Sequence, residues 1–322
     1  EMCIRDRSVA LIVVLIFGVE TAGGIGAVIH NASELPGYLS MTLSYDVNTG
    51  KAAPYSALTI VSTAAWGLGY FGMPHILLRF MAIEDEKKLK LSRRVATIWV
   101  VISLFVAVFI GVIGYTMSKV GALEMLTGSN SETIIVKISA LLSQHGVIFS
   151  LLAGVILAGI LASTMSTSDS QLLAASSAVS SDILGAFRKD SSNKNGSMAA
   201  ARITLLVISV VAAFIARNPD SSVFAIVSFA WAGFGAAFGP VVLFSLFWKR
   251  TSKWGALAGM VCGGSMVFIW KYLIRPLGGI WNIYELLPAF LIACAAIVIV
   301  SLLTPKPSKE IEEEFDRVAQ MK

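Results

Sequence analysis

The sequence predicts an all-α polytopic membrane protein, and three observations support this prediction. The chain has 322 residues, of which 56% are hydrophobic and only 14% are charged, whereas soluble domains carry about 25% charged residues. Several stretches reach the roughly 20 apolar residues that a helix needs to cross a bilayer. None of these stretches alternates apolar and polar residues like a membrane barrel strand, so helices, which pair all their backbone groups internally, are expected.

About eight spanning segments are expected in a transmembrane core over residues 9–304. They fall near 9–29, 56–79, 96–118, 147–168, 201–217, 223–247, 255–274 and 283–304. The fourth is expected to continue as a Ser/Ala-rich helix to about residue 187. Residues 1–8 resemble a translated adapter more than native protein and are excluded from the fold, and residues 305–322 are expected to form a short, charged cytoplasmic tail.

The basic residues orient this arrangement. When the N-terminus is placed inside and the segments alternate, most of the 25 Lys and Arg residues fall in cytoplasmic loops, as the positive-inside rule requires. Both ends of the chain are therefore expected in the cytoplasm. The net charge of +5 is explained by topology without a nucleic-acid partner, and the three Cys and three His residues show no spacing of a zinc site.

The second segment differs from a simple lipid-facing helix. Its run from Trp66 to His75, Trp-Gly-Leu-Gly-Tyr-Phe-Gly-Met-Pro-His, holds three glycines and a proline, which weaken a helix severely. Transporters bind solutes and ions at such interrupted helices, and a proline kink with close glycine packing is the alternative. Trp66 and Tyr70 are four residues apart and share a helix face. They form either the wall of a solute pocket or a packing pair.

The fourth segment carries a polar stripe that is unsuited to lipid. Ser163, Ser166, Thr167 and Ser170 follow the spacing i, i+3, i+4, i+7 of one helix face. Hydroxyl and carbonyl oxygens are hard donors and suit Na⁺. In the alternative interpretation these are small residues at helix contacts, whose hydroxyls bond to the carbonyl four residues back.

Asp169 lies in the same run. An ionisable side chain at membrane depth costs about 3 kcal/mol and is a functional hypothesis by default. Three roles stay open: attracting a cation, carrying a proton, or a structural role near the inner water boundary.

The sixth segment is rich in small residues. Between Trp231 and Pro240 the chain reads Trp-Ala-Gly-Phe-Gly-Ala-Ala-Phe-Gly-Pro, which suits close helix packing. Packing is the favoured interpretation, and gating is the alternative.

These runs resemble the sodium/solute symporter family, and within it the sodium/proline symporters match best. The resemblance rests on three motifs in the same order, and it covers about residues 9–304. The motifs are Trp66-Gly-Leu-Gly-Tyr70-Phe-Gly-x-Pro74-His75 with Arg79, then Met165-Ser166-Thr167 with Gln171, then the run from Trp231 to Pro240.

The resemblance implies the inverted five-helix repeat fold of bacterial leucine transporters, without about the first five spans of the family. The missing first span supplies further carbonyl ligands for sodium and an acidic residue beside the solute. We therefore expect that residues 1–322 alone do not transport.

The resemblance also implies roles for individual residues. The hydroxyls of Ser166 and Thr167 and the backbone carbonyl of Ser163 match ligands of the coupling sodium ion. Residues that match the lining of the proline site are Trp66, Tyr70 and Pro74. Candidates for coupling or gating are Gly67, Arg79, Asp169 and Gln171.

The implied function is sodium-coupled symport of a small solute by alternating access in the bacterial inner membrane. L-Proline is the favoured solute, Na⁺ is the coupling ion, and no cofactor is expected. Another amino acid, a sugar or a carboxylate is an alternative solute, and a transporter-like membrane sensor is an alternative function. An enzyme is disfavoured because its candidate residues, His75, Asp169 and Glu285, lie on separate segments.

Overall fold

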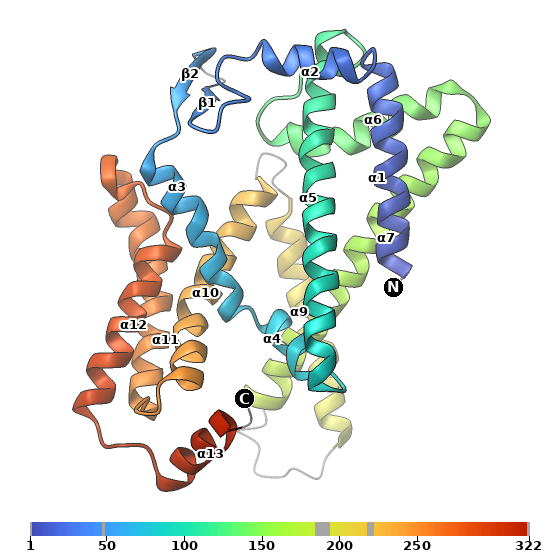
Figure 1. The fold of residues 1–322 in the computed structure, drawn as a ribbon. Helices are drawn as coiled ribbons and strands as arrows, with labels where there is room; N and C mark the ends of the chain where they lie inside the picture. The colour runs from blue at the N-terminus through green and yellow to red at the C-terminus, as the bar shows by residue number, and fades with distance from the viewer. Residues whose placement is uncertain (1, 47–48, 184–193, 218–221, 321–322) are drawn as a thin grey trace. The chain divides into compact units, whose positions relative to one another are not determined.

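The computed structural model describes residues 2–46, 49–183, 194–217 and 222–320. These residues are helical apart from loops and one β-hairpin (Figure 1). They fall into two compact units. The first unit comprises residues 1–39 and 87–222, and the second comprises residues 40–86 and 223–322.

The first unit is built from helices that pack on α1 and α7. Its helices are α1 (Met2–Thr21), α2 (Ile25–Ser33), α5 (Leu89–Lys119), α6 (Ile134–Leu142), α7 (Val147–Ser177) and α9 (Lys194–Ile215). Shorter turns are the 3₁₀-helices Glu86–Lys88, Gly128–Thr133 and Ser143–His145 and the π-helix Ala178–Ile183. Helix α1 packs against α5 and α7, and α7 packs against α6 and α9. The extension expected beyond α7 to about residue 187 lies partly outside the described residues.

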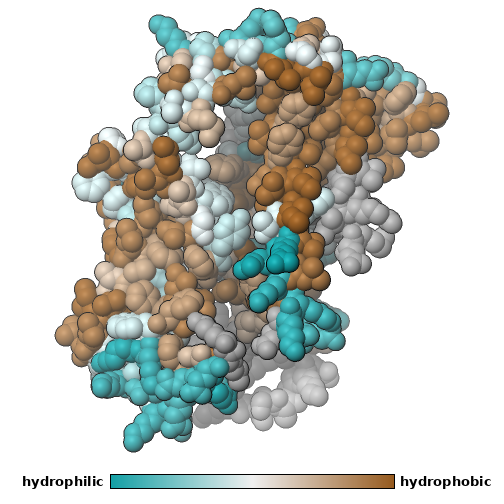
Figure 2. All heavy atoms as spheres, in the orientation of Figure 1, coloured by the Kyte–Doolittle hydropathy of each residue, from teal (hydrophilic) through white to brown (hydrophobic). Residues whose placement is uncertain are grey.

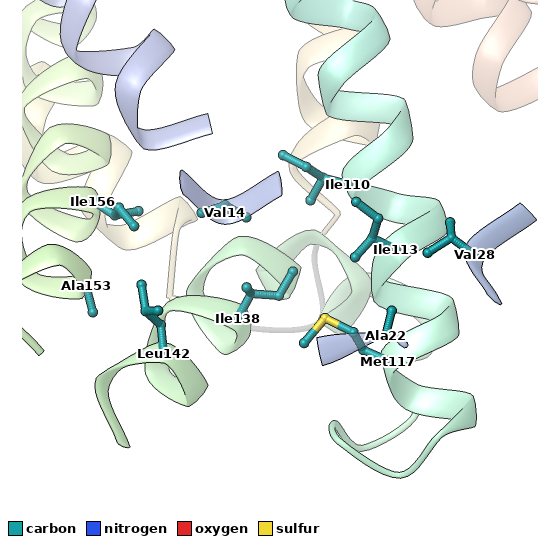
Figure 3. Packing of buried hydrophobic residues seen from close by; sticks show 10 residues of the cluster. All are labelled: Val14, Ala22, Val28, Ile110, Ile113, Met117, Ile138, Leu142, Ala153 and Ile156. Atoms are coloured by element: carbon teal, nitrogen blue, oxygen red, sulfur yellow. The ribbon is translucent and has the colours of Figure 1, made fainter. Parts of the chain in front are cut away.

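A single apolar cluster holds this unit together (Figure 3). Helices α1, α2, α5, α6 and α7 and the turn after α1 supply its buried side chains, which are Val14, Ala22, Val28, Ile110, Ile113, Met117, Ile138, Leu142, Ala153 and Ile156. Gly18 allows α1 to approach α5 closely, because a Cβ atom there would lie 2.7 Å from Ile113 Cγ2.

The segment expected at 9–29 is bent rather than straight. Helix α1 ends at Thr21, α2 begins at Ile25, and the two axes differ by 77°. Gly23 and Gly24 adopt φ of 88° and 93°, a left-handed region that side-chain-bearing residues rarely occupy. The two glycines therefore make the turn.

The second unit combines a hairpin, an interrupted helix and a bundle of three long helices. Strands β1 (Leu43–Asp46) and β2 (Lys51–Pro54) pair antiparallel, with Leu43 opposite Pro54. The interrupted part consists of α3 (Ala57–Ala64), the 3₁₀-helix η1 (Ala65–Gly72) and α4 (Pro74–Met81). The remaining elements are α10 (Val223–Phe247), α11 (Lys253–Ile269), the π-helix Trp270–Ile274, the 3₁₀-helices Arg275–Leu277 and Gly279–Trp281, α12 (Leu286–Leu303) and α13 (Lys309–Gln320).

Small residues bring the helices of the second unit together. Helices α10, α11 and α12 pack on one another, and η1 packs on α10. A Cβ atom at Gly263 would lie 2.2 Å from the carbonyl oxygen of Ala236, and one at Gly259 would lie 2.4 Å from Ile297 Cγ1. Ala236 is fully buried, so the run from Trp231 to Pro240 serves close packing, as its composition favours.

The chain is a multi-pass membrane protein. Six helices of the described residues are long and apolar enough to cross a bilayer, and the bent pair α1–α2 would make a seventh. The difference from the eight expected segments comes from the bend after Thr21 and from the interruption between α3 and α4. Hydrophobic residues cover much of the long helices in Figure 2, while hydrophilic residues gather over α13 and over the segment that leads into α5.

Candidate functional site

The second expected segment is interrupted, as its glycines and proline predict. Helix α3 ends at Ala64, η1 runs from Ala65 to Gly72, and α4 begins at Pro74. Met73 is extended, with φ −83° and ψ 112°, because a residue before proline avoids the helical region. Pro74 then takes the first position of α4, where its missing N–H leaves no intrahelical bond unmade.

Trp66 is stacked among three other rings of the second unit. The centroids of Phe224, Trp231 and Tyr284 lie 5.4, 5.6 and 5.8 Å from that of Trp66, and their planes are inclined to it by 11°, 16° and 15°. These distances and near-parallel planes are typical of offset-stacked aromatic pairs. The structure thus surrounds Trp66 with an aromatic cluster drawn from α10 and from the segment just before α12.

Tyr70 joins this cluster at its edge. Its ring meets Trp231 at 4.8 Å and 84°, and Tyr70 is 51% exposed. In a 3₁₀-helix, residues four apart are separated by about 120° rather than the about 40° of an α-helix. Trp66 and Tyr70 therefore come together through their common neighbour Trp231, and not through the α-helical face that their spacing suggested.

Glycines allow η1 to pack closely against α10. A Cβ atom at Gly69 would lie 1.9 Å from Trp231 Nε1, and one at Gly72 would lie 2.4 Å from the carbonyl oxygen of Phe234. The indole Nε1 of Trp231 donates a hydrogen bond of 3.0 Å to the carbonyl oxygen of Trp66. Close glycine packing is therefore present, and a carbonyl of the interrupted helix accepts a hydrogen bond from a side chain of α10.

Trp231 is the partner that sequence reasoning did not find. It stood at the head of the small-residue run, where only packing or gating was considered. The available signal was the aromatic residue itself, because a buried indole N–H needs an acceptor and an interrupted helix offers free carbonyls.

The polar stripe of the fourth segment lies on α7. Ser166 and Thr167 are exposed and Ser163 is half-buried. The Thr167 hydroxyl donates to the Ser163 carbonyl oxygen at 3.1 Å, and the Ser170 hydroxyl donates to the Thr167 carbonyl oxygen at 2.8 Å. The bond from Thr167 is the one that the packing alternative predicts. A donating hydroxyl still keeps oxygen lone pairs that can accept, so this bond is compatible with cation binding.

Three oxygens of one turn of α7 are the candidate ligands: the Ser163 carbonyl, which already accepts from the Thr167 hydroxyl, and the hydroxyls of Ser166 and Thr167. They carry no formal charge, and a hard monovalent cation fits such donors. A complete coordination shell needs further oxygens. Among the described residues, no group of three or more His, Cys, Asp or Glu side chains is placed to hold a metal ion.

The other predicted residues are spread over both units. Asp169 and Gln171 are exposed on α7, in the first unit. In the second unit, Gly67 lies in η1 with open space around it. Arg79 belongs to α4, and its side chain lies outside the described residues. The sodium candidates therefore belong to one unit and the solute candidates Trp66, Tyr70 and Pro74 to the other.

Comparison with known proteins identifies the lineage of this chain. Residues 8–263 match the model of the sodium:solute symporter family. The chain belongs to this family. A sodium/proline symporter of Haemophilus influenzae is 41% identical over 262 residues, which are 81% of this chain and 51% of that protein. A sodium/proline symporter of Escherichia coli is 39% identical over 259 residues, which are 80% of this chain and 50% of that protein.

A third relative extends the match toward the C-terminus. The osmoregulated proline transporter of Bacillus subtilis is 36% identical over 300 residues, which are 93% of this chain and 57% of that protein. The chain therefore spans about half the length of the curated relatives it matches. These relatives are named as transporters rather than enzymes, and the fold observed here is the all-α polytopic fold expected of a symporter in this family.

Proposed function

We propose that the protein carries out sodium-coupled symport of a small solute, with L-proline as the favoured solute, in the bacterial inner membrane with both chain ends in the cytoplasm. The proposal rests on the turn of α7 that carries three uncharged oxygens, from Ser163, Ser166 and Thr167. It also rests on the membership of the chain in the sodium:solute symporter family. Relatives named as proline symporters or transporters support the choice of solute.

The uncharged donors suit a coupling ion that must be released in each cycle. A carboxylate-rich site would hold a cation more tightly, whereas hydroxyl and carbonyl dipoles replace only part of its hydration shell. The Thr167 hydroxyl is oriented by its bond to the Ser163 carbonyl, which directs its remaining lone pairs away from that carbonyl. In this proposal both residues contribute to one ion through atoms that are already positioned.

The aromatic cluster suits a small solute with an apolar ring and a cationic nitrogen. Trp66 is held in the stack, and the ring of Tyr70 is half-exposed at its edge. The faces of such rings attract a cation and pack against aliphatic groups. We assign Trp66, Tyr70 and Pro74 to the solute site, with Gly67, Arg79, Asp169 and Gln171 as candidates for coupling or gating.

A single sodium ion supplies enough free energy for this transport. One charge moving through ~100 mV gains about 2.3 kcal/mol, and a tenfold sodium gradient adds about 1.4 kcal/mol. Together, about 3.7 kcal/mol supports an accumulation ratio of about 500 for a zwitterion at one-to-one coupling. Asp169 is therefore not needed as a second ion site.

The sodium assignment is tested by uptake in proline-transport-deficient cells that express the complete gene. Ser166→Ala and Thr167→Ala should each raise the sodium concentration needed for half-maximal proline uptake, with a smaller effect at saturating sodium. Thr164→Ala is the matched control, because Thr164 also donates to the carbonyl four residues back, that of Ile160, at 3.0 Å. An unchanged sodium requirement in both variants removes these hydroxyls from the ion site.

The solute assignment needs a separate measurement. Trp66→Ala and Tyr70→Ala should raise the proline concentration for half-maximal uptake at saturating sodium, because each removes an aromatic surface of the proposed site. Wild-type affinity in both variants contradicts the pocket, and uptake that needs no sodium gradient contradicts the function.

A further inference from the structure

The ring of Tyr284 is part of the aromatic cluster, although it comes from a different part of the chain than the motif residues. It precedes α12 and lies nearly parallel to Trp66, with the ring centroids 5.8 Å apart and the planes inclined by 15°. Tyr284 lies beyond residues 8–263, which the family model matches, and no predicted site contained it. Of the three rings stacked around Trp66, Tyr284 is thus the one that lies beyond the matched residues.

Two hydrogen bonds hold Tyr284 in place. Its backbone N–H donates to the hydroxyl of Ser62 at 3.1 Å, and its own hydroxyl donates to the carbonyl oxygen of Ser228 at 2.6 Å. Ser62 belongs to α3, just before the interruption, and Ser228 belongs to α10. Tyr284 thus connects α3 with α10, and its ring has little freedom to turn away from Trp66.

An ion pair between the half-exposed Arg275 and the buried Glu285 links the segment that carries Tyr284. The side chain of Glu285 is 2% exposed, and its Oε2 accepts from Arg275 Nη1 at 2.9 Å. Arg275 Nε also donates to Asn282 Oδ1 at 3.0 Å, so one guanidinium spans the connection between α11 and α12. Burying a charged carboxylate is costly unless it is paired, and this pair holds the residue that follows Tyr284.

We propose that Tyr284 is a positioning residue for solute specificity: its ring sets the orientation of Trp66, and the Arg275–Glu285 pair holds Tyr284 for this task. The proposal rests on the proposed function, because it takes Trp66 as a wall of the solute site. In this arrangement Tyr284 changes solute affinity through Trp66 without touching the solute.

The test measures proline uptake by cells expressing the complete gene, at saturating sodium. Tyr284→Met leaves a flexible apolar side chain that partly fills the space but removes the flat ring. It should raise the half-saturating proline concentration about two- to tenfold, the range that one aromatic pair contributes, while the maximal rate per transporter changes less. Tyr284→Phe keeps the ring but loses the hydroxyl bond to Ser228, so it should raise this value less than Tyr284→Met does. Tyr272→Met is the matched control, since Tyr272 contacts Phe229 and has no ring contact with Trp66.

A double-mutant cycle separates positioning from general packing. Once Trp66→Leu has removed the indole, adding Tyr284→Met should cost nothing further in proline affinity, whereas independent effects multiply. Independent effects, or a fall in maximal rate with unchanged affinity, overturn the positioning role. Glu285→Gln serves as a second variant if Tyr284→Met does not reach the membrane. It should raise the half-saturating concentration in the same direction, and an unchanged value overturns the role of the ion pair.

The result for the unsubstituted protein separates the two proposals. Absence of sodium-dependent proline uptake in that protein overturns the proposed function and, with it, the role of Tyr284. Normal uptake with wild-type affinity in Tyr284→Met overturns the positioning role alone.

Discussion

The contact between η1 and α10 predicts a severe effect of one added methyl group. In Gly72→Ala, the new Cβ would lie 2.4 Å from the carbonyl oxygen of Phe234, 2.7 Å from the backbone nitrogen of Gly239 and 2.9 Å from the Cα of Gly235. Ordinary contacts of a Cβ begin at about 3.4 Å. All three obstacles belong to the backbone of α10, so no side-chain rotation relieves the overlap.

The expected cost follows from how far the two elements must separate. Relief of the overlap needs a displacement of about 1 Å, which loosens the packing along η1, and overpacking of this kind costs about 1–3 kcal/mol or more. Gly67→Ala is the matched control, because nothing lies within 4 Å of a Cβ at Gly67. Replacing an unhindered helical glycine by alanine is neutral or stabilising by up to about 1 kcal/mol.

The assay is thermal inactivation of the purified protein in detergent, followed by loss of the monodisperse peak in size-exclusion chromatography. Membrane proteins commonly unfold irreversibly, so the temperature of half-loss at a fixed heating time is compared between variants. Gly72→Ala should lose stability by several degrees relative to wild type, while Gly67→Ala should match or exceed it. Equal stability of the two variants would refute the close approach of η1 to α10.

Two smaller predictions concern polar groups, one buried and one exposed. Ser301 is fully buried, and its hydroxyl accepts from the backbone N–H of Ser252 at 3.1 Å. Ser301→Ala should therefore destabilise the protein by about 1–3 kcal/mol, which the same thermal assay measures. A loss of stability no larger than that of the exposed Ser245→Ala would contradict this prediction. The Lys137 ammonium donates to the Glu124 carboxylate at 2.6 Å and holds the pKa of that carboxyl below its ordinary value of 4.5. The ion pair therefore stabilises the folded protein at pH values above 4.5, and this stabilisation is lost as the pH falls through the lowered pKa. Carboxyl NMR titration should show the pKa of Glu124 rising in Lys137→Gln, and an unchanged pKa would exclude the pair.

Local features of the fold were predictable because they depend on residues close in sequence. The apolar run expected at 223–247 is helix α10, with the same bounds. The interruption after Ala64 follows from glycines and a proline that act on their own neighbours. The bend at Gly23 and Gly24 was missed because two glycines inside an apolar run are compatible with a straight helix, and only their φ angles reveal the turn.

Long-range features were not predictable from this one sequence. Trp66 and Trp231 are separated by 165 residues along the chain, and no local pattern indicates that an indole N–H will satisfy a particular carbonyl. The stack with Tyr284 depends in turn on an ion pair in a connection between helices. The sodium assignment at Ser163, Ser166 and Thr167 stays a prediction. The structure confirms that the three residues lie on one helix, but one turn of helix cannot supply all the ligands that a sodium ion needs.

The two candidate sites rely on opposite uses of the backbone. Helix α7 is unbroken through the Ser–Thr stripe, so its carbonyls already accept backbone N–H groups, and side-chain hydroxyls must supply most of the capacity for an ion. The segment from Ala65 to Gly72 is a 3₁₀-helix followed by a break, which frees backbone groups, yet Trp231 occupies the carbonyl of Trp66. That bond of 3.0 Å takes at least one of the two lone pairs of this carbonyl oxygen. In the proposed solute site Trp66 acts mainly through its ring, so the rings that orient it become as important as the residue itself.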